Sequence, residues 1–172
     1  LELEIGFRQL FLKFEGANPT GTQKDRVAFA QAMDALRRGF EAITLSTCGN
    51  YGVAMALAAS VAGIRCIIYI PESYQTRRVK EMTDFGAEII RIGGDYETSV
   101  QISRQRAETD EIYDANPGGA NTALQLSAYG EIAYEKMPAI SRQVSSETGL
   151  PACDPLLQGV APVITALKKF LK

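Results

Sequence analysis

The first side chain that could take part in a reaction is a lysine at the end of a loop rich in glycine and threonine. Lys24 ends the segment EGANPTGTQK (residues 15–24), and a helix is expected to begin directly after it. Backbone N–H groups and the dipole at a helix start favour anions over an ammonium, which would help Lys24 act as a neutral amine in Schiff-base formation or proton transfer. The alternative is that Lys24, Asp25 and Arg26 form a solvated first helical turn.

The second candidate is a small loop between a predicted strand and an alanine-rich helix. Residues 46–52 read STCGNYG and follow the β-branched run Ala42–Leu45. Such a loop presents free backbone amides at the carboxyl end of a sheet, where open α/β sheets bind ligands, so it predicts an anion site. Its GNYG lacks the GxGxxG spacing of a dinucleotide fingerprint, and a Rossmann cofactor is therefore poorly supported. The alternative is that Thr47 and Asn50 only cap the helix while Gly49 makes the turn.

The composition excludes several kinds of chemistry. The 172 residues include no histidine, which rules out a Ser-His-Asp triad, a Cys-His pair and a His-ligated zinc site. Cys48, Cys66 and Cys153 are odd in number and lack CxxC spacing, so we expect neither disulfides nor a metal site and infer a reducing cytoplasm. The net charge of −2 argues against a nucleic-acid partner. No apolar stretch reaches the ~18 residues of a membrane span, and we expect no membrane partner.

The pattern of apolar residues predicts an α/β fold. Short β-branched runs alternate with helical patterns between residues 40 and 135, which is typical of βαβ units in a parallel sheet with helices on both faces. The expected strands are Ala42–Leu45, Arg65–Ile70, Glu88–Arg91 and Glu111–Tyr113. The expected helices are Asp25–Arg38, Tyr51–Ala62, Tyr74–Asp84, a helix capped by Asp95 that runs to about Glu108, and Asn121–Tyr134.

Both ends of the chain differ from this alternating pattern. Leu10–Phe14 alternates like a half-buried strand. Residues 136–155 contain several prolines and a polar run, which indicates a loop or junction, and Val163–Leu171 predicts a short amphipathic helix. The chain starts with Leu1, from which we expect a processed or trimmed N-terminus, and Glu2 and Glu4 lie where a signal peptide would be basic.

Several motifs together resemble one known family. Residues 12–26, LKFEGANPTGTQKDR, resemble the lysine segment of the fold-type-II pyridoxal-phosphate enzymes, and their NPTG..KDR form is most similar to threonine synthases. STCGNYG resembles the Ser/Thr-x-Gly-Asn loop of that family. The match continues in family order through residues 67–72, FGAEIIRIGGDYE (85–97), DANPG (114–118) and AYGEIAYE (128–135).

The resemblance implies a fold with two lobes. It is the three-layer fold of the tryptophan synthase beta-like enzymes, with parallel sheets and helices on both faces. Residues 1–39 would be part of the large cofactor-binding lobe, residues 40–135 the small α/β lobe, and residues 136–172 a junction and the C-terminal helix of the large lobe. The family holds the cofactor phosphate with a glycine-rich loop in its second half, and no such loop follows Glu135. We therefore expect the second lobe to be incomplete in this sequence.

The resemblance also implies roles for particular residues. Lys24 would form the Schiff base with pyridoxal 5'-phosphate and then shuttle protons. Asn50 would hydrogen-bond the 3'-hydroxyl of the cofactor. The residues around the substrate carboxylate would be Thr47, Cys48, Gly49, Asn50 and Tyr51. Cys48 and Tyr51, together with Thr22-Gln23 before the lysine, depart from the usual family residues and weaken the substrate assignment.

The implied function is that of a lyase in threonine biosynthesis. Such an enzyme converts O-phospho-L-homoserine and water to L-threonine and phosphate, so its partner would be a small amino-acid substrate. A serine/threonine dehydratase or a cysteine-synthase-like enzyme is the alternative within the same class. A non-catalytic remnant that serves as a binding or assembly module is the alternative from another class, and a homodimer is left open as the assembly.

Overall fold

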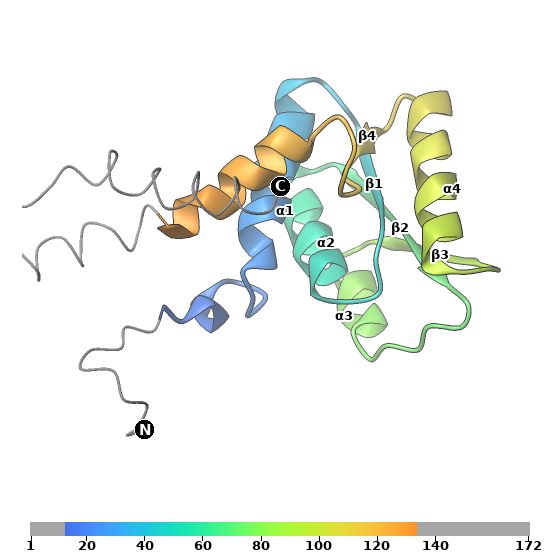
Figure 1. Ribbon diagram of the computed structural model, residues 1–172, viewed down its shortest axis with the longest axis horizontal. Coiled ribbons are helices and arrows are strands. Elements are labelled where there is room, and N and C mark those ends of the chain that lie inside the picture. Colours follow the sequence, from blue (N-terminus) through green and yellow to red (C-terminus); the bar gives the residue numbers. More distant parts are fainter. Residues whose placement is uncertain (1–12, 134–172) are drawn as a thin grey trace, which may run out of the picture.

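The computed structural model describes residues 13–133. Within this range the chain alternates between helices and parallel strands (Figure 1). The elements are η1 (Glu15–Ala17), α1 (Lys24–Arg37), β1 (Ala42–Ser46), α2 (Asn50–Ala62), β2 (Arg65–Pro71), α3 (Val79–Asp84), β3 (Glu88–Ile92), α4 (Tyr96–Thr109) and β4 (Tyr113–Asp114). A further helix covers residues 122–133.

The four strands form one parallel sheet with the order β3-β2-β1-β4. The predicted α/β class and the first three predicted strands are thereby confirmed. The fourth, expected at Glu111–Tyr113, lies at Tyr113–Asp114, because Glu111 is in a turn with a φ of 53°. Strands β2 and β3 lie on one side of β1, whereas β4 lies on the other and pairs with it over only two residues. The loops that follow β1 and β4 are therefore neighbours at the carboxyl edge of the sheet, which is where open α/β sheets bind their ligands.

Helices cover both faces of the sheet, so the molecule has three layers (Figure 1). Ile43 and Leu45 of β1 belong to the larger apolar core, which they share with α1, α2 and Ala128 of the 122–133 helix. Ile67 and Tyr69 of β2 belong to the smaller core on the opposite face, against α4. This alternation follows from the two-residue period of a strand.

Small residues let α2 lie close to the elements around it. Its alanines are almost all buried, and Gly52 lies in its first turn. A Cβ on Gly52 would lie 2.7 Å from Met82 Cε and 2.9 Å from Thr47 Cγ2, distances at which atoms overlap. The start of α2 is therefore packed tightly against α3 and against the loop that precedes it.

Two helix predictions have different outcomes. The helix expected from Tyr74 begins only at Val79, so its predicted start is wrong. The Tyr74 carbonyl accepts a hydrogen bond from Arg91 at 2.7 Å, which ties the irregular segment 74–76 to β3, and residues 77–78 form a turn before α3. The predicted cap of α4 is confirmed, because the Asp95 carboxylate accepts from the Thr98 amide at 2.8 Å.

The ends of the chain bear on the remaining predictions. Lys13 and Phe14 are not in a strand, and the rest of the predicted strand Leu10–Phe14 lies outside the described residues. The predicted junction and the helix Val163–Leu171 also lie outside them, so the division into lobes stays a prediction. None of the helices in the described range is both long enough and apolar enough to cross a membrane.

Candidate active site

Lys24 is the first residue of α1, which begins one residue earlier than the predicted helix Asp25–Arg38, and the loop before it is held by side-chain hydrogen bonds. The carboxylate of Asp25 is buried and accepts from both the amide and the hydroxyl of Thr20, at 2.9 and 2.6 Å. The Asn18 amide group donates to the Thr22 carbonyl at 3.1 Å. These bonds fix the chain on both sides of the TGTQ segment and thereby fix the position of Lys24.

Arg26 also has a structural partner. Its Nε lies 2.7 Å from the Glu15 carboxylate, and this hydrogen bond lowers the pKa of Glu15. Since Asp25 is buried and Arg26 is paired, the alternative of a solvated first turn is wrong for these two residues. Both anchor the lysine loop.

The amine of Lys24 lies among tyrosines. Its Nζ donates a hydrogen bond to the Tyr129 hydroxyl at 2.7 Å, and it lies 5.3 Å from the ring centroid of Tyr129 and 5.7 Å from that of Tyr51. Within residues 13–133, no carboxylate lies within ion-pair distance of Nζ. Without a counter-ion to hold it, the amine can be approached by an electrophile.

The STCGNYG loop follows β1 and leads into α2. Its Thr47 amide continues the ladder by donating to the Tyr69 carbonyl at 3.1 Å. Gly49 occupies the N-cap position of α2, and no side chain caps this helix, so the alternative that Thr47 and Asn50 serve as caps is wrong. Within this loop, the backbone amides of Cys48, Asn50 and Tyr51 have no hydrogen-bond acceptor in the described part of the chain. Open amides at a helix N-terminus are suited to an anion such as a carboxylate.

Asn50 is exposed at the mouth of this loop. Its Oδ1 accepts a hydrogen bond from the Arg78 guanidinium, which leaves the Nδ2 group as the free donor. Arg78 also donates to the Thr20 carbonyl at 3.4 Å and therefore joins the lysine loop to the asparagine loop. Nothing in the sequence pattern singled out Arg78, because its partners lie 28 and 58 residues away along the chain.

The side chain of Tyr51 points into the protein. Its hydroxyl lies 2.8 Å from Gln31 Oε1 and donates to the Ala115 carbonyl at 2.9 Å, and burial raises the pKa of Tyr51 well above its usual range. Of the residues predicted around the substrate carboxylate, Tyr51 can therefore offer its amide but not its hydroxyl. Thr47 can offer only its hydroxyl, since its amide is bonded to β2.

Asn116 of the DANPG segment holds the second loop at the sheet edge. Its side chain is fully buried, with Oδ1 accepting from the Ser46 amide at 2.7 Å and Nδ2 donating to Asp114 and Ser103 at 2.7 and 3.0 Å. The side chain thus extends the contact with β1 into the segment that follows β4, which ends at Asp114. It also fixes the residue that precedes Thr47.

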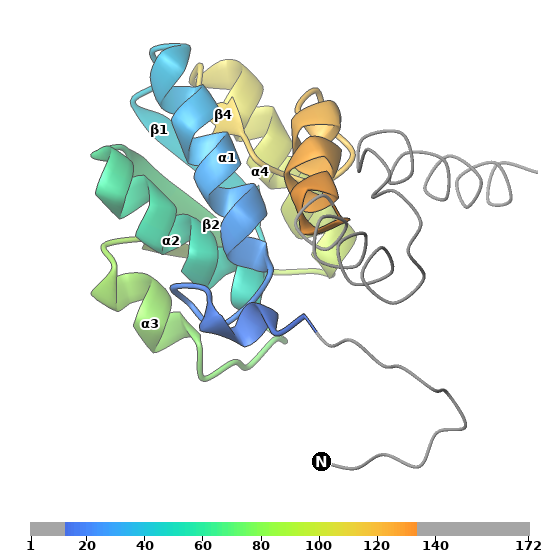
Figure 2. The ribbon, with the colours of Figure 1, turned by 90° about the vertical axis from the view of Figure 1, so that its left-hand side faces the viewer.

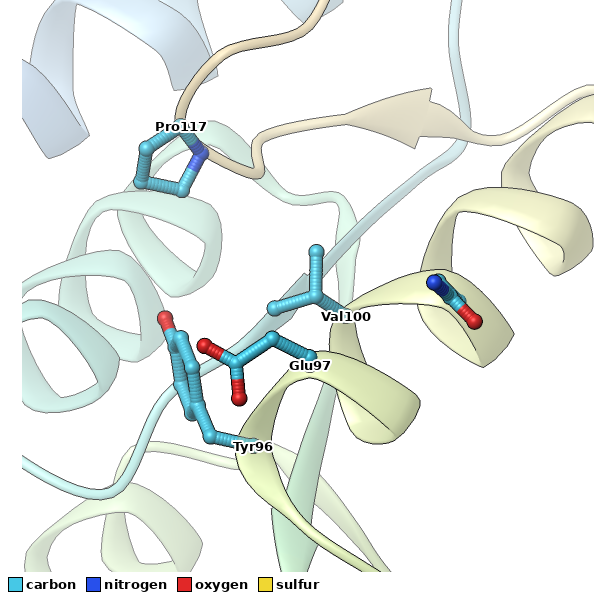
Figure 3. A pocket seen from close by; sticks show the side chains of 5 residues that line it. Tyr96, Glu97, Val100 and Pro117 are labelled. Atoms are coloured by element: carbon cyan, nitrogen blue, oxygen red, sulfur yellow. The ribbon is translucent and has the colours of Figure 1, made fainter.

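A small cavity opens beside this second loop. It has a volume of about 230 Å³ and is lined by Tyr96, Glu97, Val100, Gln101 and Pro117. Figure 3 shows Tyr96, Glu97 and Val100 projecting from the first turn of α4 on the side of the loop that carries Pro117. The Tyr96 hydroxyl donates to the Ser46 carbonyl at 3.2 Å, which links this cavity to the start of the STCGNYG loop.

The chain matches the family described as pyridoxal-phosphate dependent enzyme over residues 1–151. It belongs to this family. The cofactor of the family is pyridoxal 5'-phosphate, which agrees with the resemblance inferred from the motifs. The chain is 28% identical, over its whole length, to the threonine synthase of Methanocaldococcus jannaschii, of which it covers 40%. It is 31% identical to cysteine synthase B of Pseudomonas aeruginosa over 95% of its own length and 54% of that protein.

Solved structures agree with the fold. The cysteine synthase of Entamoeba histolytica superposes with a TM-score of 0.64 and 27% identity, over 74% of this chain and 40% of that one. The diaminopropionate ammonia lyase of Escherichia coli, at 21% identity and a TM-score of 0.66, supports the fold alone. The described part of the chain therefore has the architecture of the fold-type-II family members. The chain spans about half or less of the length of these relatives.

Proposed function

We propose that Lys24 is the residue that binds pyridoxal 5'-phosphate and that the open amides of the STCGNYG loop receive the carboxylate of an amino-acid substrate. The observation that carries this proposal is the Lys24 amine, which has a tyrosine hydroxyl as its hydrogen-bond partner and no carboxylate beside it in the described part of the chain. A lysine with a buried counter-ion would be a poor nucleophile, whereas this amine is held only by a neutral group.

The described residues fit the cofactor. When bound, pyridoxal phosphate supplies an aldehyde for an amine and a ring that delocalises the electrons of a carbanion. Lys24 would anchor the cofactor and carry a proton on its Nζ. Asn50 would donate from Nδ2 to the 3'-oxygen, because its Oδ1 is already bonded to Arg78. The amides of residues 48, 50 and 51 would bind and orient the substrate carboxylate.

For the substrate, we propose a reaction of threonine-synthase type. O-phospho-L-homoserine and water would give L-threonine and phosphate. This proposal is supported by the Asp25-Arg26 pair after the lysine and by the similarity to threonine synthases. The second candidate is a cysteine-synthase-like or dehydratase reaction, supported by the 31% identity to cysteine synthase B.

Absorbance spectroscopy tests the role of Lys24. The protein incubated with pyridoxal 5'-phosphate should develop a visible band that borohydride abolishes, and mass spectrometry should then find the cofactor attached to Lys24. Lys24→Ala should lose the band. Lys80→Ala is the matched control, because Lys80 is exposed on α3 and is ion-paired with Asp84. A visible band that persists in Lys24→Ala would refute the assignment, and the absence of any band in the unmodified protein would favour a non-catalytic module.

Substrate preference is tested by comparing kcat/KM values of a version of the enzyme that includes the whole large lobe. Release of phosphate from O-phospho-L-homoserine should be more efficient than formation of a keto acid from serine or threonine. The ratio of the two values measures the difference in transition-state stabilisation between the substrates. A higher kcat/KM for keto-acid formation would contradict the threonine-synthase proposal and favour the second candidate, a cysteine-synthase-like or dehydratase reaction.

A further inference from the structure

We propose that Arg78 is a positioning residue, which orients the side-chain amide of Asn50 and keeps its Nδ2 group free for the 3'-oxygen of the cofactor. This inference rests on the proposed function, because it concerns the residue that would bind that oxygen. Arg78 Nη1 donates to Asn50 Oδ1 at 2.5 Å, and no other hydrogen bond of the Asn50 side chain exists in the described part of the chain. The orientation of this exposed amide is therefore set by Arg78.

The guanidinium of Arg78 is itself held in place. Its Nε and Nη2 donate to the two carboxylate oxygens of Glu81, at 3.1 and 2.9 Å, in the paired geometry that suits a planar guanidinium. The backbone amide of Arg78 donates to the Thr76 hydroxyl at 3.2 Å. Both ends of the arginine are thus fixed by residues close to it in the chain, and Nη1 is presented to Asn50 in one direction.

The position of Arg78 is not explained by the helix that it precedes. Arg78 is the N-cap residue of α3, where the positive end of the helix dipole is unfavourable for a cation, and its side chain does not cap the helix. Its contacts outside α3 are with Asn50 and with the Thr20 carbonyl, at 3.4 Å. Figure 2 shows the blue segment that precedes α1 beside α3, where Arg78 reaches it. Arg78 therefore serves the two loops of the candidate site.

A guanidinium selects one of the two orientations of an asparagine amide. It carries N–H donors and no acceptor, so it can bond only the oxygen of that amide. Turning the Asn50 amide by half a turn would bring Nδ2 against the N–H groups of Arg78. Without Arg78 both orientations become available, and the ligand must then fix the side chain at its own expense in binding free energy.

Nuclear magnetic resonance of the cofactor-free chain tests the orientation directly. The Nδ2 signal of Asn50 is assigned by its disappearance in Asn50→Ala. In the unmodified protein its order parameter should be close to the value of about 0.85 for a rigid backbone, and in Arg78→Met it should fall below about 0.6. Methionine keeps a long side chain but offers no donor.

Arg77→Met is the matched control. Arg77 is adjacent in the chain and exposed, and it has no hydrogen bond or ion pair within residues 13–133. The control removes the same charge and should leave the Asn50 order parameter unchanged. Glu81→Ala is a second variant, because Glu81 is half exposed and its removal releases the guanidinium. It should lower the order parameter in the same direction as Arg78→Met.

Titration with pyridoxal 5'-phosphate, followed by the visible band, tests the consequence for the cofactor. Arg78→Met should raise the Kd by roughly two- to tenfold, the range expected when one side chain must be ordered on binding. In the Asn50→Ala background the same substitution should change the Kd by less than about twofold, because Arg78 acts through Asn50. An effect of Arg78 on the fold or on Thr20 would persist in that background.

Each result has a defined consequence. A rigid Asn50 amide in Arg78→Met, with the fold checked by circular dichroism, would overturn the proposal. An equal change of Kd with and without Asn50 would overturn it as well. The absence of a visible band in the unmodified protein would instead contradict the proposed function. The measurement on Asn50 contains no cofactor, so it decides the role of Arg78 in orienting this amide in either case.

Discussion

Gly52→Ala should destabilise the protein although alanine is the better helix former. Gly52 lies in the first turn of α2, and the added methyl group would stand 2.7 Å from Met82 Cε and 2.9 Å from Thr47 Cγ2. Met82 is completely buried and Thr47 nearly so, which leaves neither side chain free space into which to move. The substitution should therefore push α2 away from α3 and displace the STCGNYG loop.

Two opposing contributions set the size of the effect. Replacing a helical glycine with alanine stabilises a helix by about 0.5–1 kcal/mol. Adding a methyl group to a packed interior costs about 1–3 kcal/mol. The net change should be a loss of about 0.5–2 kcal/mol in the free energy of unfolding. The steric cost should exceed the gain in helix stability because the added methyl group overlaps two buried side chains, Met82 and Thr47.

Urea unfolding followed by far-ultraviolet circular dichroism measures this loss, which suits a chain without tryptophan. Gly49→Ala is the control in the same loop, because a Cβ on Gly49 would meet no atom within 4 Å and its φ of −140° is open to any residue. That variant should lose less than about 1 kcal/mol, through the weaker N-cap alone. If Gly52→Ala were as stable as the unmodified protein, the close packing inferred at the start of α2 would be refuted.

Three further predictions concern other parts of the described chain. Asn116→Ala should lose about 2–4 kcal/mol in urea unfolding, because the buried Ser46 amide is left without its acceptor. Burial raises the pKa of Cys66 to about 12, so iodoacetamide at pH 8 should modify half-buried Cys48 at least about tenfold faster, as peptide mass spectrometry would report. Hydrogen bonds at the start of α4 lower the pKa of Asp95 below its ordinary 3.8, so the loss of thermal stability in Asp95→Ala should be full at neutral pH and should shrink as acid protonates the carboxylate.

The sequence predicts the sheet well because its strands are short and sharply bounded. β2, for example, is a run of buried apolar residues that ends at Pro71, and the predicted and observed ends differ by one residue. The start of α3 was mispredicted because the turn before it depends on Arg91 of β3, a contact that no local pattern records. The Asp95 cap was predicted correctly because it depends only on Asp95 and Thr98, which are three residues apart.

The residues of the candidate site that were predicted have local signals in the sequence, whereas those that were missed depend on long-range contacts. Lys24 and the STCGNYG loop were found from residue types and spacing. Tyr129 and Arg78 were missed as site residues, because their contacts with Lys24 and Asn50 span 105 and 28 residues and arise only when the helices pack. The inward orientation of Tyr51 was missed as well, since a tyrosine beside a glycine gives no sign of the direction in which it points.

The two residues of the Lys24–Tyr129 hydrogen bond are made at very different times during translation. Tyr129 is synthesised 105 residues after Lys24, which at about 5–20 residues per second amounts to roughly 5 to 20 s. During that interval the nascent chain can form α1, the sheet and the STCGNYG loop before Tyr129 is available to contact Lys24. Until Tyr129 has been made, the Lys24 amine is without the tyrosine hydrogen bond that it has in the folded chain.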